Sequence, residues 1–242
     1  MTATWPYAAI MLAAIASGVL VSRRSQSRLP LDRGQRIGIA IGAFVGGMVG
    51  AKLPFLLADW PSLVSGVGWF ESGKTILFGL VGGYFGVEIA KWATGITVKT
   101  GDSFAVPVAV SVGVGRLACF VGGCCYGTPT HLPWGVDFGD GVCRHPTQLY
   151  ESAFHLTAAC VLALLRRGGY FRGQLVKLYI LAYLAYRFAT EFIRPEPVLA
   201  AGLTGYQLAA LGLVPIFVWL WWRDARQLPA VPNPAVLPDA SV

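Results

Sequence analysis

The sequence predicts an all-α, polytopic membrane protein with about seven transmembrane helices, its N-terminus outside and its C-terminus in the cytoplasm. Of its 242 residues, 55% are hydrophobic and only 13% are charged, about half the charged fraction of a typical soluble domain. Apolar runs of roughly 17–25 residues recur along the chain, which is the length a helix needs to cross a bilayer. Lys and Arg are also shared unevenly between the two sets of loops, as they are in membrane proteins.

Seven apolar runs account for the predicted spans, at 6–21, 37–58, 75–92, 103–121, 150–166, 174–193 and 205–222. The first follows an uncharged start, so we expect a retained span rather than a cleaved signal peptide. The fourth is interrupted by Arg116, and the sixth carries Arg187 and Glu191. The seventh ends in three tryptophans, which suit the aromatic belt at a membrane interface.

The basic residues of the loops predict the orientation. One side of the membrane holds Arg23, Arg24, Arg28, Arg33, Arg36, Lys91, Lys99, Arg166, Arg167, Arg172, Lys177, Arg223 and Arg226. The other side holds only Lys74, Arg144 and Arg194. Cytoplasmic loops are the richer in Lys and Arg, so the larger set is expected in the cytoplasm.

This orientation defines the expected domain organisation. Residues 1–226 should form a single transmembrane domain with an extracytoplasmic loop at 122–149. The Pro- and Ala-rich segment 227–242 should be a disordered tail. The net charge of +7 comes mostly from the cytoplasmic loops, and we predict no nucleic-acid partner.

Charged residues inside the predicted spans need a partner or a wet cavity, because a charge at mid-bilayer is costly. Arg187 and Glu191 are four residues apart and share one helix face. One interpretation is an ion pair that fixes helix packing. The other is a set of arginines that binds an anionic lipid headgroup, since guanidinium binds phosphate through paired hydrogen bonds. The arginines expected in the outer half are Arg116, Arg144, Arg187 and Arg194.

Five runs stand out around these arginines: GR at 115–116, YGTP at 126–129, LPWGV at 132–136, RHPTQLYE at 144–151 and YRFATEFIR at 186–194. In this order they resemble the motifs of the bacterial prolipoprotein diacylglyceryl transferase family. The resemblance extends from Tyr7 to about Trp222. It implies seven spans with an outside N-terminus, in agreement with the count of spans and loop charges.

The resemblance also implies an activity. Family members transfer the diacylglyceryl group of phosphatidylglycerol to the thiol of a lipobox cysteine and release glycerol phosphate. The implied setting is the bacterial inner membrane, with the active site on the extracytoplasmic side. The implied partners are phosphatidylglycerol or a similar anionic phospholipid, and a prolipoprotein. We predict no cofactor and no metal.

Site residues follow from the matched motifs and from the arginines and cysteines. Expected substrate-binding residues are Tyr7, Arg116, Gly127, Arg144, Gln148, Tyr150 and Arg194. Expected catalytic residues are His145, Glu151, Arg187, Glu191 and Cys124.

Three polar residues typical of the family are replaced. Cys119 and Cys124 stand where the family has an asparagine and a glutamate, and Val81 stands where it has a histidine. With that histidine missing, His145 or Glu151 is the candidate base. Alternatively, His145 orients the loop through hydrogen bonds.

The cysteines allow four interpretations. One is a disulfide of Cys143 with Cys124 or Cys125, because the outer side is oxidising. Another is a thiolate, activated by nearby arginines, that acts as a nucleophile or acyl carrier. A third is a metal site that includes His145. The last is packing of small residues at a helix end, which is also the expectation for Cys160 inside the fifth span.

Two further function classes stay open at this point. The scaffold can bind or transport lipid without the chemistry. It can also serve as a membrane thiol–disulfide protein that uses Cys119, Cys124, Cys125 and Cys143.

Overall fold

A computed structural model describes residues 5–27, 29–58, 61, 64, 73 and 75–227. Within these ranges the long helices are α1 (Trp5–Gln26), α2 (Arg33–Ala58), α5 (Ile76–Ala93), α6 (Gly101–Val121), α7 (Thr147–Arg167), α8 (Leu175–Thr190) and α9 (Gly205–Gln227). They match the seven predicted spans to within a few residues, and the longest differences are at the end of α1, the start of α2 and the end of α9. The predicted tail lies outside the described residues, apart from Gln227.

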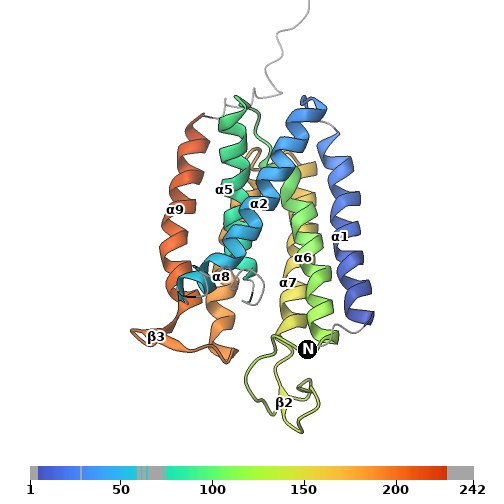
Figure 1. Cartoon of the computed structure of the whole chain (residues 1–242), viewed down its shortest axis with the longest axis vertical. Helices are drawn as coiled ribbons and strands as arrows, with labels where there is room; N and C mark the ends of the chain where they lie inside the picture. Colours follow the sequence, from blue (N-terminus) through green and yellow to red (C-terminus); the bar gives the residue numbers. More distant parts are fainter. Residues whose placement is uncertain are drawn as a thin grey trace, which may run out of the picture.

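Short elements join the helices at one end of the bundle. They are β1 (Val136–Asp137), β2 (Cys143–Arg144), the 3-10 helix η1 (Glu191–Ile193), β3 (Val198–Ala200) and β4 (Leu203–Thr204). Figure 1 shows the start of α1, the β1–β2 loop and the β3–β4 hairpin at this end, and the end of α9 at the opposite end. A chain that crosses the bundle an odd number of times begins and ends at opposite ends. The arrangement therefore agrees with the prediction that the two termini lie on opposite sides of the membrane.

Six of the described helices are long and apolar enough to cross a membrane. The remaining one, α8, has 16 residues, which is shorter than the roughly 20 that a spanning helix needs. It continues directly into η1, so the two together occupy the predicted span at 174–193. Several of its side chains, including Tyr179 and Tyr183, are almost completely buried.

The distribution of polarity is that of a protein in lipid. Large apolar side chains face outward: Phe44 is 69% exposed, Ile89 62% and Leu164 64%. Ionisable side chains are buried, among them Lys52, Arg116, Glu151, His155, Arg187 and Glu191. Because a bilayer solvates apolar surface and not charge, this arrangement fits a multi-pass membrane protein.

Helices α2 and α5 approach each other along glycines. Gly42, Gly46 and Gly50 are spaced four apart on α2, and they face Gly82 and Gly86 on α5. A Cβ atom added at Gly46 would overlap the carbonyl oxygen of Gly82, and one added at Gly86 would overlap that of Gly42. Small residues at this spacing let membrane helices pack backbone to backbone.

The segment between α6 and α7 is held as a compact loop. Strands β1 and β2 pair antiparallel, with Val136 opposite Arg144. The Asp137 carboxylate accepts three backbone hydrogen bonds from residues 139–141. The loop is also attached to η1, since the Thr128 amide donates to the Ile193 carbonyl at 2.9 Å. These contacts place the loop across the end of the bundle where the candidate site lies.

The α2–α5 contact can be tested with alanine substitutions. Gly46→Ala and Gly86→Ala should each lower the free energy of unfolding by about 1–3 kcal/mol, because the added methyl group forces the helices apart. Gly38→Ala is the matched control on α2, because nothing lies within 4 Å of the position of its Cβ atom. That change should be neutral or stabilise by up to about 1 kcal/mol. Unfolding measured in detergent with equal effects at positions 38, 46 and 86 would contradict the close approach.

Candidate active site

A buried carboxylate, Glu151 in the first turns of α7, is at the centre of the candidate site. Arg116 of α6 reaches its Oε2 atom at 2.7 Å, and Arg194, just after η1, reaches the same atom at 3.5 Å. The Tyr183 hydroxyl of α8 donates to Oε1 at 2.5 Å. Glu151 is 3% exposed and Arg116 is 5% exposed. Three separate segments therefore meet at one carboxylate.

The two arginines keep unused hydrogen-bond donors. Among the described residues, the Nε atoms of Arg116 and Arg194 are buried without a hydrogen-bond partner. The charge of Glu151 balances only one of the two guanidinium groups. A site with one surplus positive charge and unpaired donors favours binding of an anion, and a phosphate offers several acceptor oxygens.

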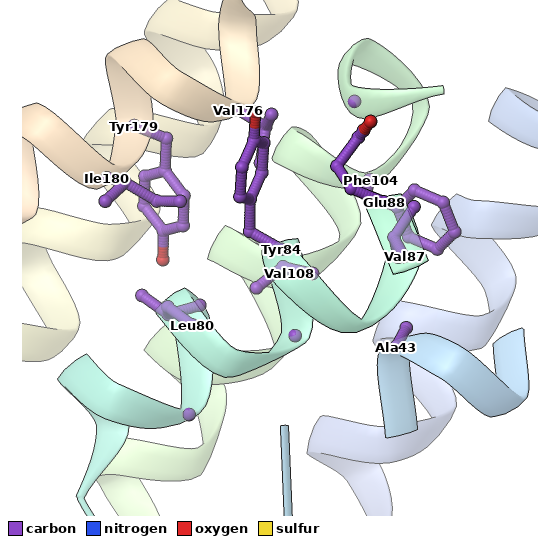
Figure 2. A pocket seen from close by; sticks show the side chains of 13 residues that line it. Ala43, Leu80, Tyr84, Val87, Glu88, Phe104, Val108, Val176, Tyr179 and Ile180 are labelled. Carbon is purple, nitrogen blue, oxygen red and sulfur yellow. The ribbon is translucent and has the colours of Figure 1, made fainter. Parts of the chain in front are cut away.

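A histidine extends the network into the bundle. His155 lies one helical turn after Glu151, and its Nε2 atom is 3.8 Å from Glu151 Oε1. Its Nδ1 atom is 2.8 Å from the Tyr179 hydroxyl. Tyr179 in turn lines an apolar cavity of about 160 Å³ between α2, α5, α6 and α8. Figure 2 shows the ring of Tyr179 at this cavity, beside Ile180 and opposite Leu80 and Tyr84.

Arg187 and Glu191 form a second, separate ion pair at 2.9 Å. The Thr204 hydroxyl donates to Glu191 at 2.9 Å, and the Arg187 guanidinium lies 4.1 Å from the centre of the Tyr206 ring. Both partners are buried. The pair therefore connects α8 and η1 to the start of α9, as the packing interpretation requires.

The loop residues form a third group. Arg144 binds Asp140 at 2.6 Å and lies over the Tyr126 ring. The hydrogen bond from Arg144 holds the pKa of Asp140 below its usual range. The His145 Nδ1 atom is 3.5 Å from the hydroxyl of Tyr150. The expected set of four arginines is thus divided, and only Arg116 and Arg194 share a carboxylate.

Two further expected site residues support the loop. Gln148 donates to the Cys124 carbonyl at 2.6 Å. Gly127 has no room for a side chain, because a Cβ atom there would lie 2.5 Å from the Ile193 carbonyl oxygen and 2.8 Å from His145 Cβ.

Tyr7 of α1 lies beside the turn that follows α6. A Cβ atom added at Gly122 would be 3.1 Å from its ring. Tyr7 is therefore close to the end of α6, where the next group of residues gathers.

Three cysteines converge beside Arg116. The Sγ atoms of Cys119, Cys124 and Cys125 all lie within 4.8 Å of one another. The hydrogen bond from the Cys119 thiol, aided by the charge of Arg116, lowers the pKa of Cys125 to about 5. All five cysteines are free, so the disulfide of Cys143, one of the four interpretations, is not formed in this structure. The cluster also does not include His145.

Three polar residues of the network, Tyr179, Tyr183 and His155, were not among the residues expected from the sequence. His155 falls inside the predicted span at 150–166. Its position four residues after Glu151 already indicated a shared helix face. That signal becomes informative only when Glu151 is known to be buried.

The comparisons with known proteins agree with the motifs. The sequence profile described as prolipoprotein diacylglyceryl transferase matches residues 2–223. A protein of Clostridium tetani (strain Massachusetts / E88) named phosphatidylglycerol–prolipoprotein diacylglyceryl transferase is 32% identical over 200 residues, covering 78% of this chain and 80% of that protein. A protein of the same name from Clostridioides difficile (strain 630) is 28% identical over 210 residues, covering 85% and 84%. Another from Solidesulfovibrio magneticus is 32% identical over 211 residues, covering 80% and 75%.

Removing the central carboxylate should be costly. Glu151→Gln leaves two buried guanidinium groups without their counter-ion, and we expect the free energy of unfolding to fall by about 3–5 kcal/mol. Asp140→Asn is the control, because Asp140 pairs with Arg144 at the loop surface and 50% of its side chain is exposed. Exposed pairs contribute at most about 1 kcal/mol. Chemical unfolding in detergent provides the comparison, and equal losses in both variants would argue against a buried charge centre at Glu151.

Proposed function

The chain belongs to the prolipoprotein diacylglyceryl transferase family, and we propose that it transfers the diacylglyceryl group of phosphatidylglycerol to the thiol of a lipobox cysteine. It is a transferase and a multi-pass protein of the bacterial inner membrane. The donor and the acceptor are those in the names of its relatives. The proposal places the reaction on the extracytoplasmic side.

The observation that carries the proposal is the pair of buried arginines at Glu151. Arg116 and Arg194 approach one carboxylate from different segments, and each keeps an Nε donor without a partner among the described residues. A phosphodiester oxygen can accept these hydrogen bonds. Guanidinium is planar and binds phosphate with fixed geometry, so the pair also orients the headgroup. The Glu151 carboxylate holds both arginines in place.

The proposed reaction needs the hydrogen bonds from the two arginines to the phosphate in its transition state. The acceptor sulfur attacks the glycerol carbon that carries the phosphate ester and forms a new C–S bond. The C–O bond to phosphate breaks, and glycerol phosphate leaves with the electron pair. Negative charge grows on the leaving phosphate during this step, so donors already aimed at it stabilise the transition state more than the ground state.

His145 is the proposed base for the thiol proton. Of the two candidates from sequence, Glu151 has its oxygens engaged by Arg116, Arg194 and Tyr183. His145 is only half-buried, and its Nδ1 atom has a long contact of 3.5 Å to the Tyr150 hydroxyl. An imidazole in this loop with only a long hydrogen-bond contact can accept a proton from the acceptor thiol.

Arginine-to-lysine changes test the headgroup site. Arg116→Lys and Arg194→Lys keep the charge but lose the planar, two-point contact. Since a hydrogen bond to a charged group contributes on the order of 1.5–3 kcal/mol, release of glycerol phosphate from labelled phosphatidylglycerol should fall roughly tenfold to a hundredfold. Thermal stability is measured in parallel and should change little, because a cation still faces Glu151.

The assay has two matched comparisons. The first is Arg166→Lys. Arg166 contacts Ser25 at the other end of the bundle, so this variant should retain full turnover. Arg187→Lys should affect turnover less than Arg116→Lys if the Arg187–Glu191 pair serves packing. His145→Gln should lower turnover by about 10²–10⁴-fold without loss of stability. Normal turnover in both Arg116→Lys and Arg194→Lys would remove the basis of the proposal.

The side of the membrane is testable by labelling. Intact cells are treated with a membrane-impermeant thiol reagent, and modified sites are identified by peptide mapping. Cys143, exposed in β2, should react in intact cells. A cysteine introduced at Ser27, in the loop after α1, should react only after the cells are opened. The reverse pattern would put the loop and its site in the cytoplasm.

A further inference from the structure

The turn after α6 brings three sulfur atoms to one point. Cys119 lies in the last turn of α6, and Cys124 and Cys125 follow the helix end. The turn passes through Gly123 and Cys125, whose φ angles are 61° and 62°. The left-handed region is unfavourable for a residue with a side chain. The chain nevertheless adopts it at Cys125, and the three Sγ atoms lie within 4.8 Å of one another.

The spacing of the sulfur atoms is that of ligands around one metal ion. Two thiolates bound tetrahedrally to Zn²⁺, with Zn–S bonds of about 2.3 Å, are about 3.8 Å apart. The Sγ atoms of Cys124 and Cys125 are 3.7 Å apart. The Sγ atom of Cys119 lies no more than 4.8 Å from each of the other two. This distance exceeds the spacing in a tetrahedral zinc site by at most about 1 Å. Little rearrangement is needed for all three to bind one ion.

We propose that Cys119, Cys124 and Cys125 bind one thiophilic metal ion with a filled d shell, Zn²⁺ or Cu⁺, through three thiolates. Soft thiolate ligands select these ions over the hard cations Mg²⁺ and Ca²⁺. The sequence analysis expected no metal and considered only a site with His145. The proposed site does not include that histidine. Its three ligands are brought together by the turn after α6.

The charge at the site is balanced by Arg116. Three thiolates and one Zn²⁺ ion leave a net charge of −1. The Arg116 Nη1 atom is 3.6 Å from the sulfur of Cys119, while its Nη2 atom binds Glu151. This guanidinium therefore lies between the metal site and Glu151, and the −1 charge of the metal site offsets the one surplus positive charge of Arg116 and Arg194.

The supporting contacts make the turn rigid. The Cys124 amide donates to the Cys119 carbonyl at 3.1 Å. Gln148 and Thr147, in the first turn of α7, donate to the carbonyls of Cys124 and Cys125 at 2.6 and 2.7 Å. Outer contacts of this kind orient the ligands of metal sites. The ligands are thus held by two helices before any ion binds.

A disulfide between the neighbouring cysteines is a poor alternative. The Cα atoms of adjacent residues are about 3.8 Å apart, whereas disulfides usually join Cα atoms at about 4.4–6.8 Å. A bond between Cys124 and Cys125 would therefore be strained. It would also leave Cys119 without a role in the cluster.

Three protein ligands leave one coordination position open, as in catalytic rather than structural zinc sites. A thiol that enters this position binds as thiolate, and its proton goes to His145, the base of the proposed reaction. The acceptor of the proposed transfer reaction is a thiol, so this use of the open position rests on the proposed function. Metal binding itself does not depend on it.

The test measures metal in the intact protein, purified in detergent without chelator. We expect about one equivalent of Zn²⁺ or Cu⁺ per chain, and the element found distinguishes the two ions. Co²⁺ added to the metal-free protein should give the strong sulfur-to-metal charge-transfer absorption of a thiolate site. Loss of one ligand should weaken binding of Zn²⁺ at least about a hundredfold, since loss of an outer contact alone costs up to that amount.

The variants are Cys119→Ser, Cys124→Ser and Cys125→Ser, with Cys160→Ser as the control. Cys160 is exposed on α7, outside the cluster, and its variant should retain the metal. Thermal unfolding identifies any variant that fails to fold. In that case Gln148→Ala is used instead, because it removes only an outer contact, and its affinity for Zn²⁺ should be about tenfold to a hundredfold weaker.

Two results would overturn the proposal. One is the absence of both a bound ion and a cobalt signal in the folded wild-type protein. The other is a disulfide within the cluster, found by non-reducing peptide mapping. A cobalt spectrum that changes with a lipobox peptide, but not with its Cys→Ser counterpart, supports the open position. Metal binding without turnover would retain the site and refute only the transferase proposal.

Discussion

The structure depends on a carboxylate that is removed from water and surrounded by positive charge. Glu151 lies between Arg116, Arg194 and Tyr183, in a bundle whose outer surface is apolar. A buried charge of this kind is tolerated only with partners at close range. The requirement fixes how α6, α7, α8 and the segment after η1 meet, because each of them supplies one member of the network.

This arrangement couples stability to binding. The carboxylate satisfies part of the hydrogen-bonding capacity of its two arginines and leaves the Nε donors unpaired. Under the proposed function, an anion that binds here can accept hydrogen bonds from these donors. The second ion pair, Arg187 with Glu191, is completed by Thr204 and the Tyr206 ring. In the proposed function the arginines at Glu151 bind the headgroup, whereas the contacts of the Arg187–Glu191 pair connect α8 to the start of α9.

The end of α6 joins two kinds of chemistry through a single side chain. Arg116 contacts a carboxylate on one side and a sulfur on the other. The family resemblance places an asparagine and a glutamate where this chain has Cys119 and Cys124. Sulfur at these two positions supplies the soft ligands that Zn²⁺ and Cu⁺ prefer. The changes at these two positions, together with Cys125, therefore form a coherent group rather than isolated losses.

The sequence by itself determined the helices, their number and the relative placement of the termini. An apolar run of about 20 residues has essentially one low-energy conformation in a bilayer, because its backbone must satisfy its own hydrogen bonds. The Arg187–Glu191 pair could also be predicted from the sequence, because residues four apart share one face of a helix. These features are local, and local spacing is what a sequence displays.

Only the tertiary structure decided which arginines share a carboxylate and which cysteines meet. Arg116 and Arg194 are far apart in the chain, and their convergence on Glu151 depends on how three segments pack. The cysteine cluster depends on a left-handed residue at Cys125, which no spacing rule specifies. Arg144, expected at the same level, instead binds Asp140 within its own loop. Contacts between distant segments are set by packing and by the balance of buried charge, and these become defined only when all helices are in place.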